Sequence, residues 1–261
     1  MKFIAIVTGA SSGVGHEYAL QLAHGKGGPL DEIWAIARTE SALKELADTT
    51  DGTTIRPIPL DLSRTESFDE LERLLDEEQP RVVWLVNCAG FGVFGSFSEI
   101  GSANARMCAL MCDGVVEMCS RCLPHMGPGS RIINLSSIAG LIPQVELATY
   151  SACKAFVLEL SRMLDHELKA AGIRVIAVCP RFMRTHFLDE PGDRGAAERM
   201  TMIGFDDVER VVARSLGYSV LDIGTYVPSH AMRLLAFLSK HIPRRALFKA
   251  EDLLFGHARR T

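Results

Sequence analysis

Short apolar runs rich in Ile and Val alternate along the chain with longer stretches of helical periodicity. Six such runs occur, at residues 3–9, 32–38, 54–62, 82–90, 130–137 and 173–180. Strands separated by helices are typical of repeated βαβ units, in which the strands are parallel. Runs that are apolar at consecutive positions fit strands buried on both faces. The pattern therefore predicts an α/β fold with a doubly wound parallel sheet.

The composition and periodicity of the sequence change after the sixth run. Residues 186–205 mix Gly, Pro, charge and Met with weak periodicity, which predicts a mobile flap. A helix is predicted at 205–217 and a last strand near 224–227. Because no internal repeat is found and no Pro/Ser-rich linker precedes residue 186, residues 1–261 are interpreted as a single domain.

The tail, about residues 229–261, is basic. It carries Glu251 and Asp252 against seven basic residues, which are Arg233, Lys240, Arg244, Arg245, Lys249, Arg259 and Arg260. A basic amphipathic helix can lie on a membrane surface or on a partner. Packing of the tail on its own sheet or on a sister subunit is the simpler interpretation and is favoured over membrane contact.

Composition excludes several classes of protein. The net charge of −4 and the 48% hydrophobic content are those of an ordinary globular protein with a substantial core. No broad basic field indicates nucleic-acid binding. Only five apolar residues of the N-terminal strand pattern precede Thr8, too few for a secretory signal. No apolar run approaches the ~20 residues of a membrane span. We therefore expect a cytoplasmic protein.

Seven cysteines raise the question of a metal site. Cys108, Cys112, Cys119 and Cys122 fall in one helical stretch and would extend over about 21 Å at the helical rise, which is too far for one zinc ion. An odd number of cysteines in a cytosolic context argues against a disulfide framework. We expect no metal and interpret the cysteines as small buried hydrophobic residues.

A glycine-rich turn, TGASSGVG at Thr8–Gly15, connects the first predicted strand to the first helix. Its glycines permit a tight bend, and the helix N-terminus offers free N–H groups to a pyrophosphate. A purely structural turn is the alternative, but the position after the first strand favours cofactor binding. The candidate residues of this turn are Gly9, Ser11, Ser12, Gly13, Val14 and Gly15.

The end of the second strand should distinguish the two nicotinamide cofactors. An acidic residue there would bond the ribose 2′-hydroxyl, but Ala37 is followed by Arg38. A guanidinium can hold a 2′-phosphate through paired charge-assisted hydrogen bonds, so NADP(H) is the predicted cofactor. The alternative is that Arg38 is an ordinary exposed arginine. Further candidate cofactor residues near later strand ends are Asp61, Leu62, Asn87, Ala89 and Gly90.

Tyr150 and Lys154 are four residues apart in a predicted helix, so both side chains share a face. Free tyrosine has a pKa of about 10, too high for easy proton exchange at neutral pH. A nearby ammonium favours the phenolate and lowers that pKa. The pair is therefore predicted to form a tuned acid–base.

These motifs together resemble the short-chain dehydrogenase/reductase family over most of residues 1–190. They are T-G-x-x-x-G-x-G, N-x-A-G, and a serine thirteen residues before Y-x-x-x-K. The resemblance implies a Rossmann-type sheet of about seven strands with helices on both faces, a nicotinamide cofactor, and hydride transfer to or from an alcohol or carbonyl carbon. The spacing of the family implies that Ser137, and not the adjacent Ser136, holds the substrate oxygen.

The resemblance also assigns cofactor contacts. Lys154, beside Tyr150, would hold the nicotinamide ribose, while Met183 and Thr185 would meet the nicotinamide amide or the phosphates. Helices expected at about 103–123 and 150–171 pair across a two-fold axis in relatives, which implies a homodimer or homotetramer.

Two positions depart from the family. Met111 stands where relatives usually carry an asparagine that is thought to hold a water in a proton relay to the lysine. A thioether is at most a weak acceptor, although a backbone carbonyl at a helix kink can hold water, so a slowed or rerouted relay is expected. Arg181 replaces a glycine; it could crowd the nicotinamide, attract an acidic substrate or point to solvent.

The sequence thus predicts an NADP(H)-dependent short-chain oxidoreductase that interconverts a ketone or aldehyde and an alcohol. An apolar cleft would be lined by segments 90–97 and 140–147 and by the flap, which would then be a substrate flap. Such a cleft favours a bulky steroid- or lipid-like substrate. The alternative is a catalytically weak NADPH-binding sensor or interaction protein of the same fold.

Overall fold

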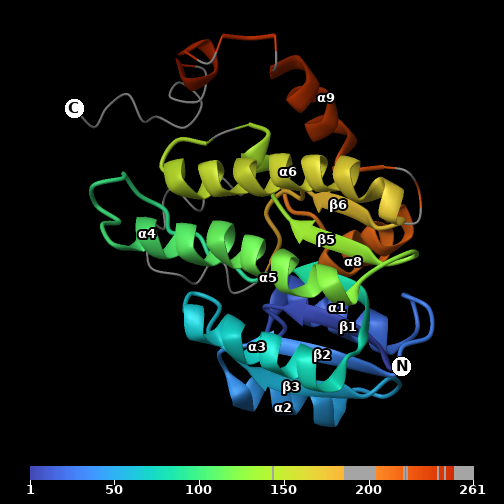
Figure 1. Cartoon of the computed structure of the whole chain (residues 1–261). Coiled ribbons are helices and arrows are strands. Elements are labelled where there is room, and N and C mark those ends of the chain that lie inside the picture. The colour runs from blue at the N-terminus through green and yellow to red at the C-terminus, as the bar shows by residue number, and fades with distance from the viewer. Residues whose placement is uncertain are drawn as a thin grey trace.

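A seven-stranded parallel sheet forms the centre of the computed structural model, in the order β3-β2-β1-β4-β5-β6-β7 (Figure 1). The structure describes residues 1–142, 144–184, 204–219, 221, 223–239, 241–243 and 245–249. The strands are β1 (Phe3–Thr8), β2 (Glu32–Ala37), β3 (Ile55–Pro59), β4 (Arg81–Asn87), β5 (Arg131–Leu135), β6 (Arg174–Val178) and β7 (Thr225–Tyr226). The predicted Rossmann-type doubly wound sheet is confirmed.

Helices cover both faces of the sheet (Figure 1). They are α1 (Gly13–Ala23), α2 (Glu40–Thr49), α3 (Thr65–Glu78), α4 (Ala103–Cys108), α5 (Gly114–Cys122), α6 (Ala148–Leu168), α8 (Val208–Tyr218) and α9 (His230–Ser239). A π-helical turn, η1 (Ala109–Asp113), joins α4 to α5, and short 3₁₀ turns occur at η2 (Leu123–His125), η3 (Ile138–Gly140) and η4 (Lys169–Ala171). The helix predicted at about 103–123 is therefore interrupted.

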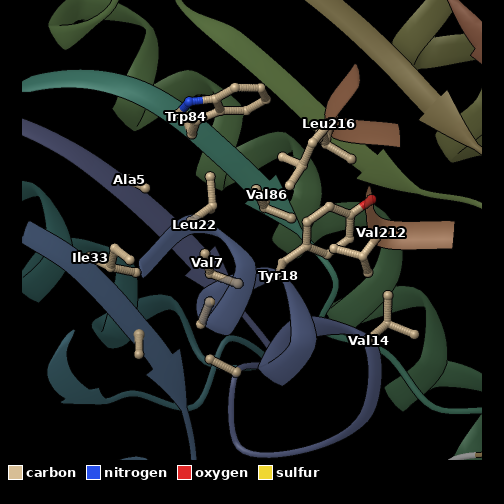
Figure 2. Packing of buried hydrophobic residues seen from close by; sticks show 14 of the residues in the cluster. Ala5, Val7, Val14, Tyr18, Leu22, Ile33, Trp84, Val86, Val212 and Leu216 are labelled. Atoms are coloured by element: carbon tan, nitrogen blue, oxygen red, sulfur yellow. The ribbon is translucent and has the colours of Figure 1, made fainter. Parts of the chain in front are cut away.

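Alternate residues of each strand enter opposite cores, because successive side chains of a strand point to opposite faces. Ala5 and Val7 pack in one core with α1, α2 and α8, and Figure 2 shows part of this core, with Tyr18 of α1 beside Val212 of α8. Ile4 and Ile6 pack in the other core with α3, α5 and α6. Burial on both faces explains the continuous apolar runs in the sequence.

The strand order places β1 between β2 and β4, so the chain leaves β1 on one side of the sheet and returns on the other. A crevice opens at the carboxyl ends of the strands at such a switch point, and ligands of open α/β folds bind there. The Thr8 hydroxyl fixes this edge by accepting hydrogen bonds from the backbone N–H groups of Cys88 (3.0 Å) and Ala89 (3.1 Å).

The predicted helix at 205–217 is α8, and the strand predicted near 224–227 is the two-residue β7. The flap at about 186–205 falls almost wholly outside the described residues, since 185–203 are not among them. Of the tail, the described part contains α9. Nowhere in the described ranges does a helix have the length and apolar character needed to cross a membrane.

The interpretation of the cysteines is correct only in part. Cys119 and Cys122 are buried, and burial raises the pKa of Cys119 to about 12. Cys108, in contrast, is exposed. Over the part of the chain that the structure describes, no group of three potential metal ligands occurs.

Candidate active site

A cavity of about 920 Å³ opens at the carboxyl ends of the strands. Fifteen of the predicted site residues line it: Gly9, Ser11, Ser12, Gly13, Val14, Gly15, Arg38, Asp61, Leu62, Ala89, Gly90, Ser137, Tyr150, Lys154 and Met183. Of the remaining two, Asn87 is not part of the lining, and Thr185 lies outside the described residues.

The glycine-rich turn is built for close approach of the backbone. Gly9 has φ +69°, and a Cβ on it would lie 3.0 Å from the backbone nitrogen of Ala89. A Cβ on Gly15 would lie 2.4 Å from the carbonyl oxygen of Gly9. The N-cap residue Ser12 makes no side-chain cap, and the first turn of α1 holds no acidic residue. The helix N-terminus can therefore receive an anion, which fits the pyrophosphate of a dinucleotide.

Arg38 is exposed at the end of β2 and lines the cavity beside Asp61. Partial burial raises the pKa of Asp61, but hydrogen bonds from Ser63 and the charges of Arg38 and Arg64 outweigh it and leave the pKa below its ordinary value. No carboxylate ends β2, since Ala37 occupies that position. The adenosine end of the cavity thus carries a guanidinium where an acidic residue would select NAD(H).

Ser137, Tyr150 and Lys154 meet on one wall of the cavity. Tyr150 and Lys154 lie one turn apart on α6, with the Lys154 Nζ 5.6 Å from the centroid of the Tyr150 ring. Ser137 follows β5 and is hydrogen-bonded through its hydroxyl to Tyr150. The backbone N–H of Ala139 donates to the Ser137 Oγ at 3.2 Å, which holds the hydroxyl in place. The three groups can act on one substrate oxygen.

The predicted effect of Lys154 on Tyr150 is wrong for this structure. Burial raises the pKa of Tyr150 to about 12, and the hydrogen bond with Ser137 opposes this without cancelling it. Burial also lowers the pKa of Lys154 to about 8. Low-polarity surroundings disfavour both charged forms. Tyr150 is consequently neutral at neutral pH, the form in which it can donate a proton.

Several contacts fix α6 against β5. The Lys154 Nζ donates to the carbonyl oxygen of Leu135 at 2.7 Å, and the Ser136 hydroxyl donates to the backbone oxygen of Lys154 at 2.7 Å. Gly140 lets η3 come close, since a Cβ there would lie 2.6 Å from the same backbone oxygen. Ser136 is thus a positioning residue, although the sequence favoured only Ser137. Its position directly after β5 is the feature of the sequence that could have indicated this role.

Asn87 is a positioning residue and does not contact the cavity through its side chain. It is buried, and its Nδ2 donates to the Asn134 Oδ1 at 2.8 Å. The Asn134 Nδ2 in turn donates to the Ser161 hydroxyl of α6 at 2.9 Å. This buried chain of hydrogen bonds joins β4, β5 and α6 beneath the site. The predicted cofactor contact of Asn87 stays a prediction.

Met111 lies in the π turn, where the Gly114 N–H donates to the carbonyl oxygen of Ala109. Its side chain is buried beside Gly90: a Cβ on Gly90 would lie 3.1 Å from the Met111 Sδ and 3.6 Å from the Lys154 Nζ. The sequence anticipated a helix kink here, and π turns of this kind are frequent at functional sites. The thioether therefore occupies space next to the Lys154 amine.

Arg181 lines the cavity and pairs with Asp206, so it does not simply point to solvent; crowding of the nicotinamide and attraction of an acidic substrate stay predictions. Its Nε and Nη2 donate to the Asp206 Oδ1 at 3.0 Å and 2.9 Å, and its backbone N–H donates to the Asp206 Oδ2 at 2.8 Å. Phe182 and Phe205 form a parallel β-bridge beside this ion pair. Arg181 thus ties the loop after β6 to the segment that leads into α8.

The substrate end of the cavity is mixed in character. Phe91, Val93, Phe94 and Ile100 contribute apolar surface, but Glu99, Arg106, Gln144 and Glu146 line it as well. Phe97, from the segment predicted to line the cleft, is 66% exposed and lies outside this lining. The expectation of a purely apolar cleft is wrong, because charged residues of α4 and the loop before it were not anticipated from the sequence.

A family model described as short chain dehydrogenase matches residues 3–194. The chain belongs to the short chain dehydrogenase family. Among curated relatives, "Probable oxidoreductase EphD" of Mycobacterium tuberculosis is 32% identical over 192 residues, covering 71% of this chain. The chain spans only 32% of the length of that relative.

Two solved structures of short-chain dehydrogenases share the fold at full length. A short-chain dehydrogenase from Sphingobium yanoikuyae in complex with NADPH is 28% identical, with TM-score 0.76 and coverage of 94% of this chain and 95% of that one. The bulky-bulky ketone specific alcohol dehydrogenase from Comamonas testosteroni is 27% identical, with TM-score 0.73 and coverage of 95% and 94%.

Proposed function

We propose that this short-chain dehydrogenase uses NADP(H) to interconvert a ketone or aldehyde and an alcohol on a bulky, largely hydrophobic substrate. The observation that carries the proposal is that Ser137, Tyr150 and Lys154 line the same cavity as the glycine-rich turn of α1. A dinucleotide with its pyrophosphate on that turn reaches along the strand ends toward the three side chains.

When bound, NADPH supplies a hydride to the carbonyl carbon. The Ser137 hydroxyl donates a hydrogen bond to the carbonyl oxygen and orients it. The Tyr150 hydroxyl, neutral because its pKa is about 12, gives its proton to that oxygen as negative charge develops. The phenolate left behind is stabilised by the Lys154 ammonium and takes a new proton from solvent. Oxidation of the alcohol reverses each proton movement.

NADP(H) is preferred over NAD(H) in this proposal because of the charge at the end of β2. Arg38 is exposed on the cavity wall, so its guanidinium can pair with a 2′-phosphate. Asp61, whose pKa is lowered and which is therefore anionic at neutral pH, is held by Ser63 and lies beside the guanidinium. The relative from Sphingobium yanoikuyae, solved with NADPH, supports the same cofactor.

A bulky ketone is the proposed substrate because aromatic side chains line part of the cavity. Phe91 and Phe94 offer apolar surface, while Glu99 and Arg106 can receive a polar substituent. The Comamonas testosteroni enzyme, named for bulky-bulky ketones, supports this size class.

A catalytically weak NADPH sensor is the second candidate, and Met111 favours it. A buried thioether beside Lys154 cannot relay a proton as an amide-held water could. The sensor would bind NADPH and turn over no ketone.

A homodimer or homotetramer formed through α5 and α6 is also proposed. Phe156 and Met163 of α6 are 42% and 56% exposed, and Val116 of α5 is 39% exposed, so these helices carry apolar side chains for a partner to cover. Sedimentation as a monomer at micromolar concentration would overturn this. Cytoplasmic localisation stays a prediction.

The decisive experiment titrates the protein with NADPH and NADH separately and then offers ketones of increasing size. NADPH should bind at least about tenfold more tightly than NADH, and Arg38→Gln should remove that preference while leaving NADH affinity unchanged. Arg64→Gln is the matched control, because Arg64 also acts on Asp61 but does not line the cavity. Equal binding of the two cofactors would refute the assignment of Arg38 as the residue that selects NADPH. Binding of NADPH without turnover of any ketone would favour the sensor over the enzyme.

A further inference from the structure

Helix α9 exposes its large apolar side chains. Leu234 and Phe237 are each 60% exposed, and Leu238 is 46% exposed. The residues that α9 buries are the small ones, Ala236 and Ser239, each 6% exposed. A helix that covers its own sheet shows the reverse, with the large apolar side chains inside. The favoured interpretation of the tail is packing on its own sheet or on a sister subunit, and packing on its own sheet does not account for this face.

The apolar surface continues past the end of α9. Ile242 is 40% exposed and Phe248, in the helical residues 245–249, is 41% exposed. α9 itself is attached to the body of the protein, since Met232 packs on the cluster that contains Ile138 and Val227. In Figure 1, α9 lies beyond α6, at the end of the molecule opposite α2. We call Leu234, Leu235, Phe237, Leu238, Ile242 and Phe248 the α9 surface.

The segment that carries the α9 surface is basic. No Asp or Glu occurs between residues 223 and 250, although Glu251 and Asp252 follow directly; the whole chain, in contrast, has more acidic than basic residues, 32 against 28. Of the basic residues in this segment, Arg233, Arg245 and Lys249 are described and exposed. Large apolar side chains with basic residues among them match an anionic lipid surface, in which acyl chains receive the former and headgroups the latter.

We propose that the α9 surface docks on an anionic phospholipid bilayer, with α9 lying in the interface. With 10 residues, α9 is about 15 Å long at the helical rise, half of a hydrocarbon core, so it lies on the bilayer and does not span it. A second copy of the chain is the less suitable occupant. A two-fold axis that paired the α9 surface with itself would set the basic residues of this segment against one another.

The test is sedimentation of the full-length protein with vesicles, which does not depend on turnover and is therefore separate from the proposed function. The protein should pellet with phosphatidylcholine vesicles that contain phosphatidylglycerol and stay in the supernatant with phosphatidylcholine alone. Raised salt should weaken the binding, because ions screen exposed charges. Absence of binding to the anionic vesicles would overturn the proposal.

Two pairs of variants assign the binding to the α9 surface. Leu234→Ser with Phe237→Ser should abolish pelleting, whereas Met163→Ser, at a 56% exposed position of α6, should not. Arg245→Gln with Lys249→Gln should weaken binding several-fold, whereas Lys44→Gln with Arg73→Gln, which removes two exposed cations of α2 and α3, should not. If the α9 variants leave vesicle binding intact but change the oligomeric state, the surface is a contact between copies and the lipid proposal is wrong.

Discussion

The two helical segments behind the catalytic wall differ in what they present there. α6 is unbroken over 21 residues and carries Tyr150 and Lys154. The facing run of α4, η1 and α5 is interrupted by a π turn and places Met107 and Met111 in a cluster with Cys153 and Tyr150. The phenol and the amine thus come from one helix, and Met107 and Met111, which pack beside the phenol, come from the other.

This difference shows why both pKa values move toward the neutral forms. Side chains of low polarity surround the phenol and the amine, so burial raises the pKa of Tyr150 to about 12 and lowers that of Lys154 to about 8. The hydrogen bond with Ser137 acts in the opposite direction on the pKa of Tyr150 and is the smaller effect. The lysine is the group that changes charge near neutral pH. The following changes test that division of roles.

Lys154→Met should have the largest effect. Removing the ammonium leaves the Tyr150 phenolate unstabilised, so reduction should slow by at least about 100-fold. The fold should gain stability. The pKa of Lys154, about 8 against an ordinary 10.5, corresponds to a cost of about 3 kcal/mol for burying the ammonium. Loss of the hydrogen bond to Leu135 reduces the gain by about 1 kcal/mol. Thermal unfolding and NADPH oxidation measure the two effects, and Lys44→Met, at an exposed site, should change neither. A less stable Lys154→Met protein would contradict the assigned cost.

The pH dependence of reduction should follow Lys154. The amine carries its charge below about pH 8 and loses it as the pH rises through that value, so the rate should fall about tenfold between pH 7 and pH 9. Tyr150, with a pKa of about 12, stays protonated over this range and contributes no change. Lys154→Arg keeps a cation at all these pH values and should remove the alkaline decline in the surviving activity. If the rate of Lys154→Arg still declined at alkaline pH, the decline would belong to a titrating group other than Lys154.

Met111→Asn should have the smallest effect and should make the two helices more alike. An amide oxygen near Lys154 favours the ammonium, so the alkaline decline should move up by less than about one pH unit. The buried amide should also cost about 1–3 kcal/mol of stability. Met107→Asn is the matched control: Met107 is equally buried in the same cluster, so this variant should lose stability without moving the decline. A shift in both variants would show that polarity alone, and not position, sets the pKa of Lys154.

The parts of the molecule that sequence could predict are those fixed by short-range backbone rules. The strands follow from apolar runs. The turn before α1 follows from Gly9 and Gly15, where an added Cβ would collide with the backbone. The Tyr150 and Lys154 pair follows from helical spacing. The strand runs and the helical spacing depend on neighbours close in sequence, and glycine at the turn is visible in the sequence even though Gly9 also lies against Ala89.

The parts that sequence could not predict depend on contacts between distant segments. Arg181 pairs with Asp206, which lies 25 residues later in the chain, just before α8. The side chain of Asn87 turns to Asn134 and not into the cavity. Burial reversed the expected pKa shift of Tyr150, and helical spacing carries no measure of burial.

The most direct test of the central claim compares the wild-type protein with Tyr150→Phe at pH 7. NADPH binding is followed by its fluorescence, and a bulky ketone is then added to the same sample. The account predicts equal NADPH affinity and rapid NADPH oxidation by the wild type, with a loss of at least about 100-fold in Tyr150→Phe because no proton reaches the alkoxide. Equal oxidation rates in the two proteins would contradict the assignment of Tyr150 as the proton donor.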